Sequence, residues 1–111
     1  MPKLTWSKMM ARHPAAHLVM AIADDGQDAA RLLTRLFDGM ALAGGWAVRA
    51  KKEGKVEFAE CVFAEKTAAD KVAKLFGATG IGRYPGWQSQ REFRLDKRAE
   101  AMILQALEQL A

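Results

Sequence analysis

The stretch HLVMAIA at residues 17–23, followed by DDG at residues 24–26, decides how this chain folds. Seven nearly continuous apolar residues have the length of a strand, and such a run is typical of a central strand that is covered on both faces. The three residues after it have the chemistry of a turn and a helix cap. We therefore expect a buried strand followed directly by a helix, with Asp25 as the N-cap residue.

Apolar residues next recur every three or four positions, which is the pattern of one face of an amphipathic helix. In residues 26–43 they are Ala29, Leu32, Leu33, Leu36, Phe37 and Met40. Gly44 and Gly45 are expected to stop this helix, because glycine adopts the left-handed C-terminal conformation at no steric cost.

A hairpin follows the first helix. Residues 46–51 alternate between apolar and polar side chains, as a half-buried strand does, and residues 55–63 form the return strand. The alternation of the return strand is imperfect, because Glu60 falls on the same face as Phe58. We expect a bulge near Ala59 that re-aims the strand.

The second half of the chain repeats this kind of pattern. Thr67 and Asp70 resemble a capping box that opens a second helix, and Gly77 is placed to end that helix. A short alternating strand follows at residues 91–96. Asp96 then caps a C-terminal helix whose apolar stripe consists of Ala99, Met102, Ile103, Ala106, Leu107 and Leu110.

The expected order of elements is strand, helix, strand, strand, helix, strand, helix. It predicts an α+β protein with a ferredoxin-like βαββαβ antiparallel sheet and an additional C-terminal helix. In that fold two helices cover one face of the sheet and the other face stays bare. The C-terminal helix must bury its stripe on this bare face or on a partner chain. We favour a homodimer, because symmetric dimers are the commonest way to close such a surface.

Length and composition limit the possible number of domains, the partners and the cellular compartment. A chain of 111 residues predicts one α+β domain over residues 17–111, preceded by a basic lead-in over residues 1–16. The formal charge of +4 permits contact with nucleic acid without requiring it. One cysteine excludes an internal disulfide and fits a reducing compartment. No signal-peptide pattern or membrane-spanning run is evident, so we expect a cytoplasmic protein that does not contact a membrane.

The loop at residues 77–87 is the first candidate site. Its glycines give G-x-x-G-x-G after a helix, which is not the dinucleotide-binding pattern. It also carries Arg83, Tyr84 and Trp87, residue types that dominate binding hot spots. The alternative interpretation is a plain connection that Trp87 pins to the core.

The hairpin at residues 46–63 is the second candidate site. Its cations Arg49, Lys51, Lys52 and Lys55 could contact phosphates. The alternative is that lysines at a hairpin tip are simply solvated and protect the strand edge. An RNA-recognition type of domain is disfavoured, because residues 17–23 contain no aromatic side chain on which bases could stack.

No reaction-specific motif stands out, so we expect no metal, no cofactor and no catalytic residues. His13 and His17 are four residues apart, but Pro14 between them argues against a shared helical face. Cys61 lies among acidic residues that would raise its pKa, and it is interpreted as a buried structural thiol. Three neighbouring acids are interpreted as turn and helix-cap residues, namely Asp24, Asp25 and Asp28.

The function that these patterns favour is a small non-catalytic protein-binding or assembly module, most simply a homodimer. Its expected contact residues are Arg83, Tyr84, Trp87, Met102 and Leu107. One alternative is a nucleic-acid-associated protein that uses the basic hairpin and the N-terminal segment. A further alternative is a small-ligand sensor or enzyme with a pocket under the loop at 77–87.

Overall fold

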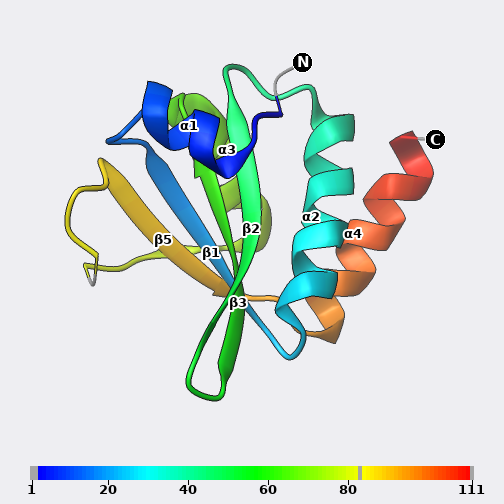
Figure 1. The fold of residues 1–111 in the computed structure, drawn as a ribbon. Helices are drawn as coiled ribbons and strands as arrows, with labels where there is room; N and C mark the ends of the chain where they lie inside the picture. Colours follow the sequence, from blue (N-terminus) through cyan, green and yellow to red (C-terminus); the bar gives the residue numbers. More distant parts are fainter. Residues whose placement is uncertain (1–2, 83, 111) are drawn as a thin grey trace.

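The computed structural model describes residues 3–82 and 84–110. The chain is α+β, and its strands form one five-stranded sheet in the order β2-β3-β1-β5-β4 (Figure 1). The elements in chain order are α1 (Trp6–Arg12), β1 (His17–Ala23), α2 (Gly26–Met40), β2 (Trp46–Glu53), β3 (Val56–Phe63), α3 (Lys66–Phe76), β4 (Thr79–Gly80), β5 (Ser89–Arg94) and α4 (Lys97–Leu110).

The sheet is mixed, so the prediction of a four-stranded antiparallel ferredoxin-like sheet is wrong in its last part. β3 pairs antiparallel with both β1 and β2, as predicted, but β5 runs parallel to β1. The reason lies in residues 77–88. After α3 the chain forms the two-residue strand β4, turns back, and returns as β5 between β4 and β1. This extra reversal changes the direction of the last long strand.

Three helices share one face of the sheet. Side chains of α2, α3 and α4 pack with β1, β2, β3 and β5 into the larger hydrophobic cluster. At its centre Phe37 makes edge-to-face contacts with Trp46 and Phe63, at centroid distances of 5.5 and 5.4 Å. In Figure 1, α3 lies behind the sheet, and α2 and α4 run side by side.

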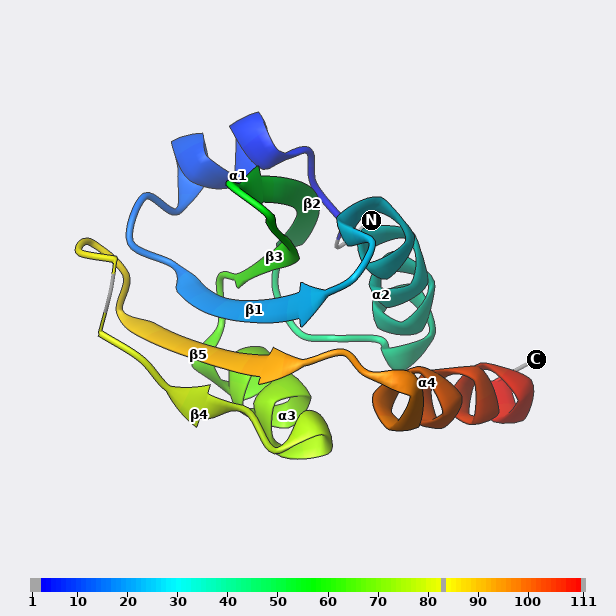
Figure 2. The same cartoon turned by 90° about the horizontal axis from the view of Figure 1, so that it is seen from below.

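The opposite face is not bare. α1 packs against it through the fully buried Met9, and the loop adds the half-buried Tyr84 and Trp87 to the same smaller cluster. Figure 2 shows α1 and α3 on opposite sides of the sheet. The backbone N–H of Leu4 also donates to the carbonyl of Trp46 over 2.8 Å. The basic N-terminal segment is therefore packed onto the sheet.

Helix ends follow the sequence in two cases and depart from it in a third. Asp25 caps α2, since its Oδ1 accepts the N–H groups of residues 27 and 28 at 3.0 and 3.1 Å. Gly77 ends α3 in the left-handed conformation, with φ of 63°. α2, however, ends before the glycine pair, because Ala41 adopts the left-handed conformation with φ of 50°.

Two local predictions are wrong. The pairing of β3 runs through Ala59 without a bulge, because Glu60 stays on the face that alternation assigns to it. The capping box at Thr67 does not form either. α3 begins at Lys66 with Glu65 at the N-cap position, two residues before Thr67, and the carboxylate of Asp70 pairs with Lys66 instead.

The C-terminal helix does not cover the second face. α4 lies beside α2 on the side that already holds two helices (Figure 1). Within residues 3–82 and 84–110, no helix is long and apolar enough to cross a membrane.

Candidate functional site

α4 is fixed to the rest of the molecule along one side. Its first turn is capped by Asp96, whose Oδ1 accepts the N–H of Ala99 at 2.9 Å. Ile103 is 1% exposed and belongs to the main core, while Ala106 and Leu107 pack against that core from the helix edge. Leu107, a predicted partner contact, is thus used largely within its own chain.

The other side of α4 carries apolar side chains in solvent. Leu104 is 45% exposed, and Leu75 near the end of α3 is 40% exposed. Solvent contact at this level leaves much of the hydrophobic free energy of each leucine unused. One side of α4 is therefore buried against the core, and the other side leaves apolar surface in contact with solvent.

A groove of about 540 Å³ lies between α3 and α4. Met102, another predicted partner contact, is among the residues that line it, together with two arginines. The lining residues are Leu75, Phe76, Arg94, Asp96, Arg98, Ala99, Ala101, Met102 and Gln105. Phe76 is held in place by a stacked contact with Phe93, at a centroid distance of 4.3 Å. The groove thus has a rigid apolar wall.

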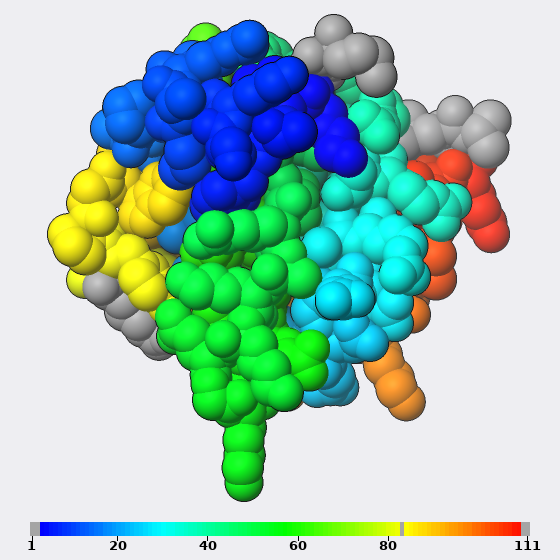
Figure 3. Space-filling view, in the orientation of Figure 1, coloured from blue at the N-terminus to red at the C-terminus, as the bar shows by residue number. Residues whose placement is uncertain are grey.

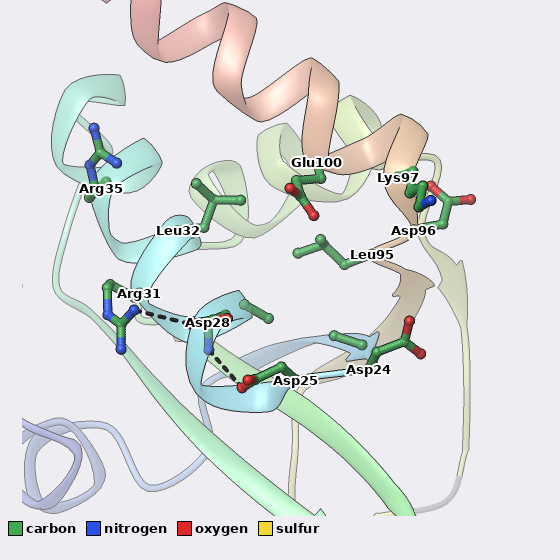
Figure 4. A pocket seen from close by; sticks show the side chains of 12 residues that line it. Asp24, Asp25, Asp28, Arg31, Leu32, Arg35, Leu95, Asp96, Lys97 and Glu100 are labelled. Atoms are coloured by element: carbon green, nitrogen blue, oxygen red, sulfur yellow. Dashed lines mark hydrogen bonds and ion pairs between the residues drawn. The ribbon is translucent and has the colours of Figure 1, made fainter.

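A second cavity, of about 430 Å³, opens where β1 and β5 end and the helices α2 and α4 begin (Figure 4). Its acids include Asp25 and Asp96, which cap the two helices, and Asp28, which pairs with Arg31 at 3.0 Å. Carboxylates at helix N-termini are stabilised by the helix dipole, so these acids have a structural use. Among the described residues no three His, Cys, Asp or Glu side chains are grouped to hold a metal ion.

The basic hairpin is less free than the sequence suggests. Arg49 donates from Nε to Glu60 Oε1 at 2.7 Å, and its guanidinium carbon lies 3.8 Å from the centroid of the Trp6 ring. Glu60 is only 5% exposed, and its ion pair with Arg49 explains how a carboxylate is tolerated at this buried position on the sheet. Lys51 lies 3.8 Å from the carboxylate of Glu53.

The tip of the hairpin keeps its charge exposed. Lys52 and Lys55 are both exposed, and the β2–β3 hairpin projects from the body of the molecule in Figure 3. The hairpin therefore presents Lys52 and Lys55 to solvent at its tip, whereas Arg49 and Lys51 lie beside carboxylates.

The glycine-rich loop is attached to the sheet. Gln90 on β5 accepts the N–H of Tyr84 at 2.9 Å and donates to the carbonyl of the same residue. Trp87 packs against the smaller cluster, as the interpretation of a pinned connection requires. Arg83, the third predicted contact in the loop, lies outside the described residues.

One polar cluster was not foreseen from the sequence. His17 at the start of β1 lies opposite Ser89 at the start of β5, and His17 Nδ1 is 2.9 Å from Ser89 Oγ. Burial lowers the pKa of His17, although nearby Asp70 opposes this shift. The two residues are 72 positions apart in the sequence, so no local pattern indicates that they meet.

Asp70 on α3 belongs to the same region. Hydrogen bonds from Lys66 and Arg91 lower the pKa of Asp70 to about 2. Arg91 on β5 pairs with it directly, which ties α3 to the parallel strand. Cys61 is buried in the core, as predicted, and burial raises the pKa of its thiol far above the ordinary value.

No protein-family model, curated protein or solved structure matches this chain.

Proposed function

We propose that this protein is a small cytoplasmic, non-catalytic assembly module, and that it forms a homodimer through the exposed side of α4 and the adjoining α3–α4 groove. The observation that carries the proposal is the division of α4 into a buried side at Ile103 and an apolar exposed side at Leu104. Exposed apolar surface next to a groove is typical of protein-contact sites.

The structural roles of the polar side chains favour binding rather than catalysis. Asp25 and Asp96 cap helices, and Glu60 holds Arg49 in an ion pair. These are structural uses of groups that a catalytic site would need to keep available.

The expected affinity is modest. Complete burial of a leucine side chain contributes about 1.5–3 kcal/mol, so a half-exposed leucine retains about 1 kcal/mol for association. A dimer would bury Leu75 and Leu104 of both copies, which gives roughly 4 kcal/mol before other contacts. A gain of about 4 kcal/mol alone corresponds to a dissociation constant of about 1 mM, and association itself costs several kcal/mol. We therefore expect a weak dimer that depends on further contacts along α4 and the groove.

The test is a solution mass measured by light scattering across a concentration series. Wild type should shift from monomer to dimer as its concentration rises, and Leu104→Glu should remain a monomer. Val56→Glu is the matched control, because Val56 is 49% exposed but lies at the start of β3, away from α4. A monomer at all concentrations, or equal loss of dimer in both variants, would refute the proposal.

Nucleic-acid binding is a second candidate, favoured by the exposed Lys52 and Lys55 at the projecting hairpin tip (Figure 3). Two of the four predicted contacts, Arg49 and Lys51, lie next to carboxylates and would have to give up those partners. Binding to a single-stranded oligonucleotide that weakens steeply with salt would support this candidate.

A further inference from the structure

The exposed side of α4 carries a regular stripe. Its members are spaced by four, three and four residues, so they lie on one side of the helix over three turns. All of them are exposed, and the buried Ile103 lies on another side of the same helix. The stripe consists of Lys97, Ala101, Leu104 and Glu108.

The stripe is complementary to the same stripe on a second copy of α4 that runs in the opposite direction. Read from the other end, it places Glu108 where Lys97 stood and Leu104 where Ala101 stood. We propose that two copies of this chain pair through antiparallel α4 helices. In that pairing Lys97 of one copy faces Glu108 of the other, and Ala101 faces Leu104.

Parallel pairing of the same stripe is much less favourable. It would place each Lys97 against the other Lys97 and each Glu108 against the other Glu108. Like charges at this spacing repel, whereas opposite charges across helices select partner and orientation. A small residue opposite a large one also lets two helices approach closely. Charge and shape therefore select the same antiparallel arrangement.

This arrangement agrees with the position of α4 in the fold. The helix lies at the periphery and extends beyond α3 in Figure 2, so a second helix can approach its outer side. A two-fold axis across the centre of the stripe produces a closed dimer in which each contact occurs twice. Ala101 belongs both to the stripe and to the lining of the α3–α4 groove, so the paired helix would cover the edge of that groove.

The inference rests on the proposed function, because it specifies the geometry of the homodimer. Four proteins test it: wild type, Lys97→Glu, Glu108→Lys, and the double variant that carries both changes. The dissociation constant of each is measured by analytical ultracentrifugation at low salt, and circular dichroism confirms that each variant is folded.

Each single variant should weaken the homodimer about fivefold, because surface ion pairs are worth roughly 0.2–1 kcal/mol and two of them reverse in each dimer. The double variant should regain the wild-type dissociation constant. A mixture of the two single variants should form a heterodimer that is tighter than either homodimer, because one stripe is then wholly acidic at its charged positions and the other wholly basic.

The outcomes separate the two proposals. A wild-type protein that stays monomeric overturns the proposed function, and the antiparallel pairing with it. A wild-type dimer that Leu104→Glu breaks, but whose charge variants show neither rescue nor a preferred heterodimer, overturns the antiparallel pairing alone. Rescue together with heterodimer formation supports both.

Discussion

Replacing Ile103 and Leu104 one at a time with alanine tests the orientation of α4 on which the assembly argument depends. The two residues are neighbours in the sequence, yet Ile103 is 1% exposed and Leu104 is 45% exposed. Ile103→Ala removes buried carbon atoms and leaves a cavity. Leu104→Ala removes atoms that are already half in water. The two substitutions should therefore have very different effects on the free energy of unfolding.

The magnitudes follow from that difference. Isoleucine-to-alanine changes in cores cost about 2–5 kcal/mol, so we expect a loss of ~3 kcal/mol for the fully buried Ile103. For 111 residues the unfolding entropy near 60 °C is about 230 cal/mol/K, so this loss lowers the Tm by about 13 °C. Leu104→Ala should cost less than about 1 kcal/mol, because half of its burial is absent from the start and alanine favours helix.

The assay is a urea titration in which tryptophan fluorescence monitors unfolding. Protein is kept at a low concentration, so that dimer formation does not add to the measured stability. A loss below about 1 kcal/mol for Ile103→Ala would mean that α4 is not docked on the core as described. Equal losses for the two variants would mean that α4 is rotated, so that Leu104 would not lie on an exposed side available to a second copy.

Three further predictions concern other parts of the chain. The pKa of His17 is lowered in the folded protein. The unfolding free energy should therefore fall as the pH drops below about 6.5, the pKa of histidine in the unfolded chain, and level off below the folded pKa. His17→Asn should remove this slope in urea titrations at pH 5 to 8. Buried Cys61 should react with a thiol reagent only as fast as the protein unfolds, so a fast reaction in native buffer would contradict its placement. Charge reversal at Lys51 and Lys52 should leave the dimer mass unchanged, and a loss of assembly would move the interface to the hairpin.

The sequence predicts local structure well where a single pattern dominates. The apolar run at residues 17–23 gives β1 with the expected bounds, and Asp25 caps α2 as its side-chain chemistry requires. The buried state of Cys61 also follows from its place in a strand. In each case the determining interactions lie within a few residues or follow from the hydrophobic pattern.

The failures arise from contacts between distant residues. Glu60 indicated a bulge, because it interrupts the apolar face that it shares with Phe58, but Arg49 on the neighbouring strand stabilises it there. Asp70 indicated a capping box, but it pairs with Arg91 on β5. The direction of β5 depends on how the chain turns after Gly77, and no periodicity in residues 77–88 records that turn.

The candidate site shows the same division. Sequence placed Met102 on the apolar stripe of α4, and the structure places it in the groove. The predicted stripe includes Leu107, which packs on its own core, and omits Leu104, which faces solvent. The pattern could not show which apolar residues of α4 stay available to a partner, because that depends on how α4 is rotated against α2.

The parallel pairing of β1 with β5 has a consequence for the order of events during folding. The hairpin of β2 and β3 can close locally, and β1 can join it early, but β5 pairs with a strand 72 residues away. Contacts between such distant segments form late, because the intervening loop must close first. During synthesis at about 5–20 residues per second, β1 would wait roughly 4–14 s for its second neighbour. Throughout that interval the edge of the apolar strand at residues 17–23 that later pairs with β5 is open, so the nascent chain stays prone to aggregate until its last strand arrives.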